Sequence, residues 1–264
     1  MFHKFRPTPF FMKKIIDVNK LLTIPMSISE KFHKKTKLKE QLPFLHPKDW
    51  PKEWKDVKFK AYARFEELKL PKAHLSNTLS YKKVLFKRMS QRIFSNKRIS
   101  NEKLSALLYY SAGLKTFREP WTGNRFYPSA GSRYPLETYV ITINSELPQG
   151  IYHYYLKNHS LEKIRIFDNF GWDKFVTQPG FKNPACLIVL TAVFKRNTIK
   201  YGDRGYRFVL MESGHLSQNF YLTAVSIGLG CCLMGGFQDD KFNQLIDIDG
   251  KEESVLAVLV IGEK

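Results

Sequence analysis

The chain has few cysteines and no long hydrophobic run. Only three of its 264 residues are cysteines, two of them adjacent at Cys231 and Cys232, so it offers neither a disulfide framework nor metal-ligand spacing. No apolar run reaches the roughly 18 residues of a membrane span, and the N-terminus has no apolar core followed by a small-residue cleavage site. These absences exclude a disulfide-stabilised secreted protein and a helical membrane protein, and we expect a cytoplasmic chain without a membrane partner.

Several common functional motifs are also missing. No Gly-x-Gly-x-x-Gly follows a strand, and there is no Gly-x-x-x-x-Gly-Lys loop, so any phosphate-bearing cofactor is expected to be a mononucleotide. The histidines, among them His33, His153 and His215, lack the spacing of a Ser-His-Asp, Cys-His or metal site. We therefore expect structural histidines and no metal.

Positive charge is abundant but unevenly placed. The formal net charge is +19, and residues 1–100 hold 25 Lys and Arg against 8 Asp and Glu, whereas residues 101–264 hold 18 against 16. A basic first third fits a nucleic-acid, acidic-lipid or acidic-peptide partner, and it equally fits a lysine-rich solvated face. Because the basic residues are mostly irregularly spaced lysines, without Arg-Gly or Arg-aromatic interleaving, nucleic acid is the least favoured partner.

The composition changes near residue 80. Residues 1–79 are rich in lysine and proline, with short helices expected around Phe11–Leu22 and Ser29–Leu42. The stretch Trp50–Tyr62 is expected to lie across the main domain, because its aromatic side chains would otherwise form a large exposed apolar patch. We interpret residues 1–79 as a basic N-terminal extension that packs on a domain formed by residues 80–264.

Helices and strands interleave in residues 80–264. Helical spacing or capping predicts helices over Tyr81–Phe94, Ser100–Gly113, Tyr206–Gly228 and Asp239–Leu245. Alternation or continuous hydrophobicity predicts strands over Leu136–Asn144, Ile151–Tyr155, Ala185–Phe194 and Val255–Ile261. Residues 115–135 are expected to form a loop. The elements do not follow a regular βαβ order, which favours an α+β fold. On the longest helix, one stripe is expected to contain Phe208, Met211, His215, Leu222 and Val225.

The segment PSAGSRYP at 128–135 predicts a loop that approaches a flat ligand. Pro128 fixes the entry dihedral, and small residues keep side chains out of the way of a ring. The residues expected to line the ligand are Pro128, Ser129, Ala130 and Ser132. Gly235 and Gly236 also allow close backbone approach. An ordinary surface turn before a strand has the same composition.

Arg88, Ser90 and Arg92 form an Arg-x-Ser-x-Arg pattern that suits a phosphate. Two planar guanidinium groups bind an oxyanion bidentately, and a hydroxyl fills the gap between them. The same spacing also arises on a solvated basic helix face.

Lys200 and Tyr201 stand in KYGDRGYR, at the expected start of the longest helix. A free tyrosine has a pKa of about 10, and a neighbouring ammonium favours the phenolate. The pair is therefore a candidate proton acceptor, with the residues from Gly202 to Gly205 supplying the turn that lets both side chains act together. A surface lysine beside a packed tyrosine is the alternative interpretation.

These segments together resemble the FMN-dependent nitroreductase family. Within it, PSAGSRYPLE at 128–137, QGIYHYY at 149–155, KYGDRGYRFVLMESGHLSQN at 200–219 and GLGCCLMGGF at 228–237 resemble the SagB-type dehydrogenases. That group includes the azoline oxidases of thiazole- and oxazole-modified peptide biosynthesis. The resemblance covers residues 80–264 and extends more loosely into the extension.

The resemblance implies a nitroreductase-like α+β fold, with a central, mostly antiparallel sheet flanked by helices. It also implies a homodimer with an FMN in each of two sites at the subunit interface. By matching positions, the FMN phosphate and ribityl region would contact Arg88, Ser90 and Arg92. The flavin would contact Pro128, Ser129, Ala130, Ser132, Gly235 and Gly236. Lys200 and Tyr201 match the family's catalytic pair, whereas Ser132 replaces the Asn of many nitroreductases.

The implied activity is oxidation of a peptide thiazoline or oxazoline to the aromatic azole. Tyr201, polarised by Lys200, would take the ring proton while FMN takes the hydride. A precursor peptide and a cyclodehydratase complex are the implied partners. Two alternatives stay open: a broad-specificity nitroreductase or quinone reductase that uses NAD(P)H, and a flavin-less protein that binds peptide or nucleic acid through its basic extension.

Overall fold

The computed structural model of the chain describes residues 27–38, 45–55, 59–75, 79–118 and 121–264. The chain separates into two compact units, Met1–Pro43 and Phe44–Lys264. Residues 45–79 therefore belong to the same unit as the domain that the composition placed after residue 79. The helix expected at Phe11–Leu22 lies outside the described residues.

The smaller unit contains one described helix, α3 (Ile28–Lys35). Ser27 and Glu30 form a capping box, in which each side chain accepts a hydrogen bond from the other residue's backbone N–H. The helix ends at Thr36, whose hydroxyl donates to the carbonyl of Phe32. It is thus shorter than the expected Ser29–Leu42.

Seven strands of the larger unit form one sheet in the order β1-β6-β5-β4-β7-β9-β8. Every neighbouring pair is antiparallel, as expected. The strands are β1 (Glu67–Lys69), β4 (Leu136–Thr142), β5 (Gly150–Tyr155), β6 (Ser160–Ile166), β7 (Cys186–Val193), β8 (Leu229–Met234) and β9 (Glu253–Glu263).

A separate hairpin of β2 (Leu114–Arg118) and β3 (Trp121–Arg125) occupies part of the expected loop at 115–135. The prediction of a loop was therefore wrong for these two strands. The pattern did not reveal them because the hairpin register shifts repeatedly. Such bulges interrupt the two-residue alternation by which a strand is recognised.

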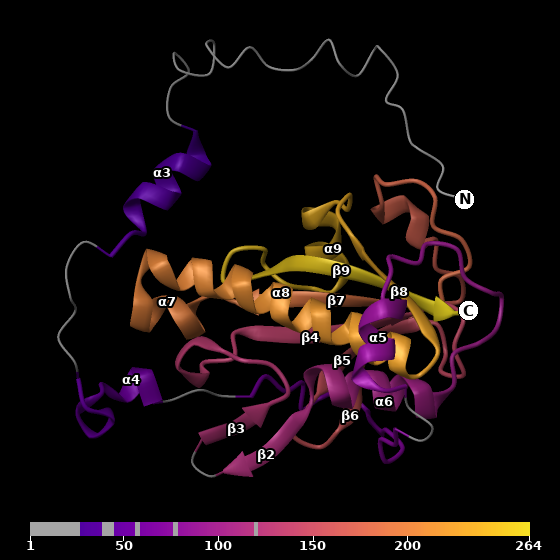
Figure 1. Cartoon of the computed structure of the whole chain (residues 1–264), viewed down its shortest axis with the longest axis horizontal. Helices are drawn as coiled ribbons and strands as arrows, with labels where there is room; N and C mark the ends of the chain where they lie inside the picture. The colour runs from indigo at the N-terminus through magenta and orange to yellow at the C-terminus, as the bar shows by residue number, and fades with distance from the viewer. Residues whose placement is uncertain (1–26, 39–44, 56–58, 76–78, 119–120) are drawn as a thin grey trace. The chain divides into compact units, whose positions relative to one another are not determined.

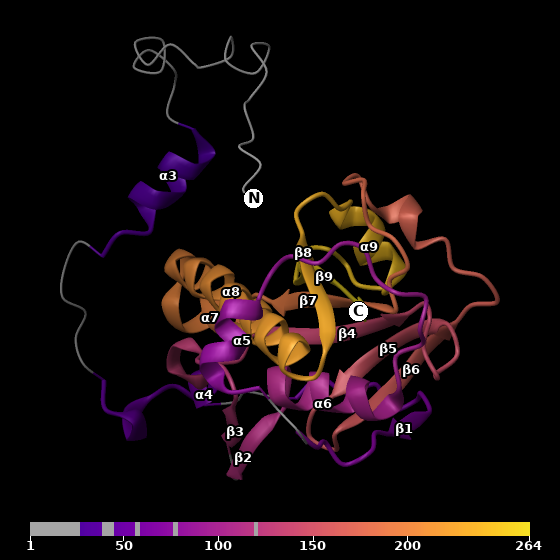
Figure 2. The ribbon, with the colours of Figure 1, turned by 45° about the vertical axis from the view of Figure 1, so that its right-hand side comes forward.

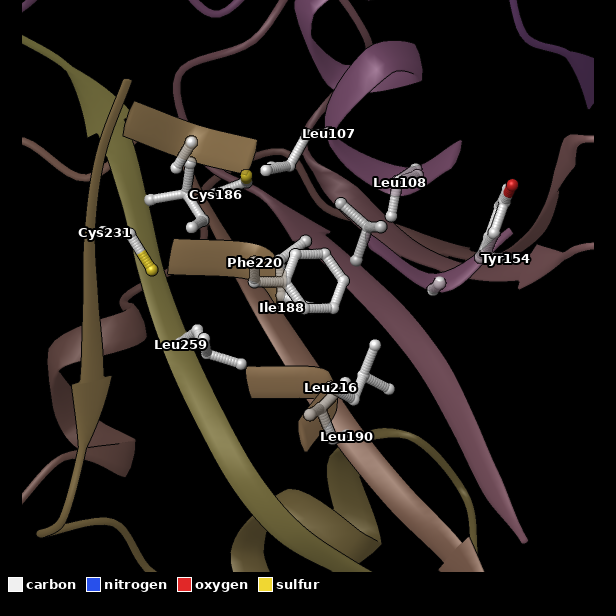
Figure 3. Close-up of a cluster of buried hydrophobic side chains, with 14 of the residues drawn as sticks. Leu107, Leu108, Tyr154, Cys186, Ile188, Leu190, Leu216, Phe220, Cys231 and Leu259 are labelled. Atoms are coloured by element: carbon white, nitrogen blue, oxygen red, sulfur yellow. The ribbon is translucent and has the colours of Figure 1, made fainter. Parts of the chain in front are cut away.

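The central strands are buried on both faces. Ile188 and Leu190 of β7 pack in one apolar cluster with Leu216 and Phe220 of α8 (Asp203–Ser226), as Figure 3 shows. Leu187 and Val189 point to the opposite cluster, which also contains Phe242. This two-sided burial explains why β7 is apolar throughout.

Helices cover both faces of this sheet. Besides α8, the described helices of the larger unit are α4 (Lys52–Lys55), α5 (Tyr81–Lys87), α6 (Asn101–Ala112), α7 (Lys195–Tyr201) and α9 (Asp239–Leu245). The helix α8 packs on the same face of the sheet as α6, and α9 lies on the other face (Figures 1 and 2). Short 3₁₀ turns are η1 (Pro47–Asp49), η2 (Ala130–Ser132) and η3 (Trp172–Phe175). The fold is therefore α+β.

The helix predicted over Tyr81–Phe94 is half as long as expected. It ends at Lys87, and Arg88 is already extended. The following backbone pairs with other segments instead, because Gln91 N–H donates to Cys231 O and Phe94 N–H donates to Lys182 O. Tertiary hydrogen bonds therefore override the helical spacing.

Two expectations about the longest helix were also wrong. Lys200 and Tyr201 end the separate helix α7 rather than beginning α8, and Gly202, at φ 54°, links the two. The predicted stripe is wrong in part: Val225 is buried, but Met211 is 57% exposed and His215 is exposed. Besides Val225, the buried residues of α8 include Val209, Glu212, Ser213, Leu216, Ser217 and Phe220.

Candidate functional site

Lys200 and Tyr201 occupy the last turn of α7, next to the first turns of α8. The Tyr201 ring packs edge-on against Phe208, with ring centroids 5.1 Å apart. Gly202 follows with φ 54° and ends α7, a conformation that glycine adopts without strain. The sharp break between the helices leaves both side chains at one end of α8.

The PSAGSRYP loop lies against this pair. A Cβ built on Gly131 would overlap the Tyr201 hydroxyl oxygen and lie 3.4 Å from Lys200 Nζ. Gly131 also has φ 61°, so both its conformation and its contacts call for glycine. Pro128, Gly131 and Ser132 are exposed, while Ser129 and Ala130 are half-buried. The two motifs are thus in contact.

Hydrogen bonds hold the loop in place. The Ser129 hydroxyl accepts the Tyr134 N–H at 2.8 Å, and the Ser129 carbonyl accepts the Ser132 N–H at 3.1 Å. The buried Arg133 donates through Nε to the carbonyl of Arg196 in α7. The loop and α7 are therefore fastened to each other.

The α7 helix is in turn attached to the sheet. Arg196 forms an ion pair with Glu137 of β4 at 2.5 Å and also donates to Tyr134 O at 3.1 Å. Burial alone would raise the pKa of Glu137, but Arg196 and His153 hold that pKa at about 2. Glu137 is therefore charged at neutral pH, and its ion pair with Arg196 holds α7 to β4.

Burial acts on Lys200 and Tyr201 in opposite directions. Burial raises the pKa of Tyr201, with Arg133 opposing this shift, and burial together with Arg133 lowers the pKa of Lys200. The sequence led us to expect a phenol pKa lowered by Lys200. Instead, the environment disfavours the phenolate and favours the neutral amine.

A buried carboxyl group lies beneath the loop. Glu212 of α8 is 1% exposed, and burial raises its pKa to about 7 against the opposing effects of Ser129 and Arg125. A carboxyl with this pKa changes charge near neutrality. The influence of Ser129 on this pKa relates the carboxyl to the proposed ligand-lining loop.

Arg88, Ser90 and Arg92 lie at the other end of α8. The Ser90 and Tyr221 hydroxyls are 3.1 Å apart, and the Arg88 guanidinium lies 5.5 Å from the Tyr221 ring centroid. Arg88 and Arg92 are exposed. Arg88 has extended backbone, and Ser90 forms an isolated parallel bridge with Cys231 of β8.

Gly235 and Gly236 follow β8 on this same side. The Tyr221 hydroxyl accepts the N–H of Leu233 at 2.7 Å, two residues before the glycines. A Cβ on Gly235 would meet nothing within 4 Å, whereas one on Gly236 would crowd Thr177. Gly235 thus leaves open space.

The expected cofactor residues consequently form two groups. One group contains the loop residues near Tyr201, which contacts Phe208 of α8, and the other contains the residues near Ser90, which contacts Tyr221 of α8. These α8 residues are separated by about 20 Å along the helix axis, given a rise of roughly 1.5 Å per residue. One chain does not bring all the expected residues to one place.

The sequence interpretation missed Arg133, Glu212 and the role of Trp50. Arg133 lies inside the recognised loop, and Glu212 occupies the buried stripe of an amphipathic helix, where a carboxylate is unusual. Both signals were present in the sequence. The Trp50 ring centroid lies 3.3 Å from Lys200 Nζ. This contact joins segments that are far apart in sequence, so no local pattern indicates it.

The described residues hold neither a membrane span nor a metal cluster. No helix in that part of the chain is long and apolar enough to span a membrane. No group of three or more His, Cys, Asp or Glu residues there is arranged to hold a metal ion. Cys186, Cys231 and Cys232 are free thiols buried in the core.

Comparison with known proteins identifies relatives over most of the larger unit. A nitroreductase-like protein of Methanocaldococcus jannaschii is 33% identical over 186 residues, covering 69% of this chain and 89% of that protein. The microcin B17-processing protein McbC of Escherichia coli is 28% identical over 153 residues, covering 55% of this chain and 56% of McbC. The trifolitoxin-processing protein TfxB of Rhizobium leguminosarum is 25% identical and covers 51% of this chain and 38% of TfxB.

Solved structures share the fold. A nitroreductase-like protein from Anabaena variabilis has a TM-score of 0.71 and 24% identity, and the match covers 89% of this chain but only 46% of that one. A second match is a chain of the E. coli microcin synthetase McbBCD complex with truncated pro-MccB17 bound. It has a TM-score of 0.61 and 20% identity, and the match covers 96% of this chain and 99% of that one. The model of the nitroreductase family matches residues 85–263. The resemblance seen in the sequence is therefore confirmed, and the chain belongs to the nitroreductase family.

Proposed function

We propose that this chain is an FMN-dependent dehydrogenase that oxidises thiazolines or oxazolines in a peptide to thiazoles or oxazoles. The observation that carries the proposal is the contact of Lys200 and Tyr201 with Gly131. The contact supports the proposal because it joins a candidate proton-transfer pair to the loop that we propose lines the flavin. Relatives named for processing microcin B17 and trifolitoxin support a peptide substrate.

The residues present fit FMN. Arg88 and Arg92 are exposed and offer planar donors for a phosphate, with the Ser90 hydroxyl between them. A cavity of about 720 Å³ at the same end of α8 is lined by Lys87, Lys103 and Lys264 among others, which adds positive charge. When bound, FMN would supply the two-electron acceptor for the hydride.

We further propose that the site forms between two copies of the chain. The two groups of cofactor residues lie at opposite ends of α8, so a partner turned end to end would bring its loop group to this chain's Arg88 group. Exposed apolar side chains support such an interface, since Leu210 is 44%, Met211 57% and Phe86 81% exposed.

In this mechanism the Lys200–Tyr201 pair accepts the proton from the ring carbon. The directions of the two pKa shifts favour the Lys200 amine as the final acceptor, with the Tyr201 hydroxyl close to the ligand-lining loop. Removing this proton together with the hydride takes two hydrogens from the azoline and leaves the aromatic ring. The buried Arg133 fastens the adjacent loop to α7, the helix that carries the pair.

We propose a precursor peptide and a cyclodehydratase as partners. The substrate ring must first be made by loss of water from a Cys, Ser or Thr side chain and the preceding peptide carbonyl, which is cyclodehydration. The solved microcin synthetase McbBCD complex contains a chain of this fold together with a truncated pro-MccB17. The basic first third of the present chain also suits an acidic leader peptide.

The test uses FMN-loaded protein and a synthetic peptide that carries one thiazoline. We expect loss of two hydrogens, read by mass spectrometry. Rapid NAD(P)H-dependent reduction of a nitroaromatic with an untouched thiazoline would instead favour the nitroreductase activity for which the M. jannaschii relative is named. Failure to take up added FMN would favour the flavin-less binding protein.

A further inference from the structure

Two indole rings cover the Lys200 ammonium. Nζ lies 3.3 Å from the ring centroid of Trp50 and 5.4 Å from that of Trp54, and the two indoles meet edge to face with centroids 6.3 Å apart. Both tryptophans are half-buried. They precede residues 85–263, the part that the family model matches.

The segment that carries the indoles is fastened to the ligand-lining loop. Arg133 donates to the carbonyls of Trp54 and Glu53, and α4 packs beside α7 at the same end of the molecule (Figures 1 and 2). Within the segment, Trp50 Nε1 donates to Leu45 O at 3.0 Å. One buried guanidinium therefore fixes the indoles relative to both Gly131 and Lys200.

The indoles hold the Lys200 amine without an ion pair to a carboxylate. The ion pairs formed among the described residues do not include Lys200. An indole face attracts an ammonium through its quadrupole but accepts no proton and donates none to it there. A carboxylate partner would instead keep the amine protonated. The Lys200 N–H bonds therefore remain available to Tyr201 and to a ligand.

We propose that Trp50 and Trp54 are positioning residues that hold Lys200 Nζ against Gly131 and beside the Tyr201 hydroxyl. The consequence for turnover rests on the proposed function, whereas the placement of the amine does not. The N-terminal region then completes the site rather than serving only as a docking extension. The proposal predicts that the π face, and not merely the bulk, of residue 50 is needed.

The experiment measures how reactive Lys200 is in the full-length, FMN-loaded protein. A brief, low-conversion pulse of acetic anhydride is followed by peptide mass spectrometry, with the exposed Lys195 of the same helix as the internal reference. Trp50→Leu keeps an apolar group but removes the π face. We expect the ratio of Lys200 to Lys195 acetylation to rise about fivefold, the factor that corresponds to one cation–π contact.

Two further variants separate positioning from general destabilisation. Trp50→Phe restores a π face and is expected to return the acetylation ratio close to that of the wild type. Trp172→Leu removes an indole of the opposite apolar cluster and should leave the ratio unchanged. Trp54→Leu, with the more distant ring, should raise it less than Trp50→Leu. An unchanged ratio in folded Trp50→Leu, or an equal rise in Trp50→Phe, overturns the proposal.

A second readout concerns turnover of the thiazoline peptide. Trp50→Leu is expected to lower kcat while leaving the KM for the peptide near the wild-type value, and Trp50→Phe should recover most of kcat. A change confined to KM contradicts a role in positioning Lys200. If the wild type does not oxidise the thiazoline, the proposed function fails, and the acetylation ratios still decide whether the indoles hold the amine.

Discussion

The two ends of α8 offer a ligand different things. At the Asp203 end, Lys200 and Tyr201 are packed against Gly131, partly removed from water and shifted in pKa. At the Ser226 end, the Arg88 and Arg92 side chains stand exposed. Proton transfer requires groups whose pKa the protein has tuned, whereas binding a phosphate requires charge that the ligand can reach.

The groups suited to proton transfer and those suited to phosphate binding therefore lie at opposite ends of one helix. Under the proposed function, each end would supply one half of an FMN site, and the two ends are separated by about 20 Å of helix. The division is the reason that we propose a site shared between two copies of the chain. Changes at the two ends should accordingly have separable effects, one on turnover and one on FMN binding.

The largest effect is expected at the Asp203 end. Tyr201→Phe should lower kcat for the thiazoline peptide by about 10²–10⁴, the usual contribution of a positioned proton-transfer group. FMN content, read from absorbance after gel filtration, should stay the same. Tyr206→Phe, on the first turns of α8, is the control and should retain activity. Full activity in Tyr201→Phe would remove Tyr201 from the mechanism.

Lys200 should determine how activity depends on pH. Because its pKa lies below the ordinary 10.5, kcat should rise with pH through that lowered pKa as the amine loses its proton. Lys200→Arg, which stays protonated, should lose this rise along with most of the turnover. An unaltered pH profile in Lys200→Arg would assign the base to another group.

A buried carboxyl at the same end should affect stability. The folded-state pKa of Glu212, about 7, lies above its ordinary 4.5. The stabilisation of the fold by protonated Glu212 is therefore fully present below pH 4.5 and is lost as the pH rises through 7. The change amounts to about 3 kcal/mol at most. Glu212→Gln should remove that loss in urea unfolding at pH 5 and pH 8, whereas the exposed Glu66→Gln should not.

At the Ser226 end the effect should fall on cofactor affinity. The double change Arg88→Ala and Arg92→Ala should weaken FMN binding about 10- to 100-fold, since each charge-assisted hydrogen bond contributes about 1.5–3 kcal/mol and part is recovered from neighbouring lysines. At saturating FMN, kcat should be unchanged. Arg98→Ala, on the same exposed stretch, should bind FMN normally. Equal affinity in the double variant would move the phosphate elsewhere.

The smallest effect concerns the loop itself. Gly131→Ala places a methyl group against Tyr201 at φ 61° and should destabilise the fold by about 1 kcal/mol or more in urea unfolding. Gly214→Ala is a matched control on α8, where an added Cβ meets nothing within 4 Å. It should stabilise by up to about 1 kcal/mol because alanine favours a helix. A neutral Gly131→Ala would mean that the loop contact is loose.

Periodicity predicted most of the fold. The continuous apolar run at β7 and the Ser100 cap of α6 depend on local chemistry, and both are observed. The helix after Tyr81 was predicted too long, because residues 88–94 satisfy their backbone by pairing with β8 and Lys182. Such long-range pairing leaves no mark on the local pattern.

The candidate site was predictable in its parts but not in its arrangement. Gly131 and the Lys200–Tyr201 pair were chosen from local sequence, and the structure brings them into contact. Their separation from Arg88 depends on the length of α8. The cover provided by Trp50 depends on Arg133 reaching the carbonyl of Trp54. Neither the separation nor the cover follows from a motif.

The central claim is that opposite ends of α8 from two copies form one site. Two variants are mixed that are each inactive at limiting FMN, Tyr201→Phe and the Arg88→Ala, Arg92→Ala double variant. They are unfolded and refolded together at limiting FMN, and thiazoline oxidation is measured. Each mixed dimer would contain one intact site, so the mixture should recover about a quarter of wild-type activity, as expected for random pairing in a two-fold dimer. A mixture as inactive as its two parents would contradict the shared site.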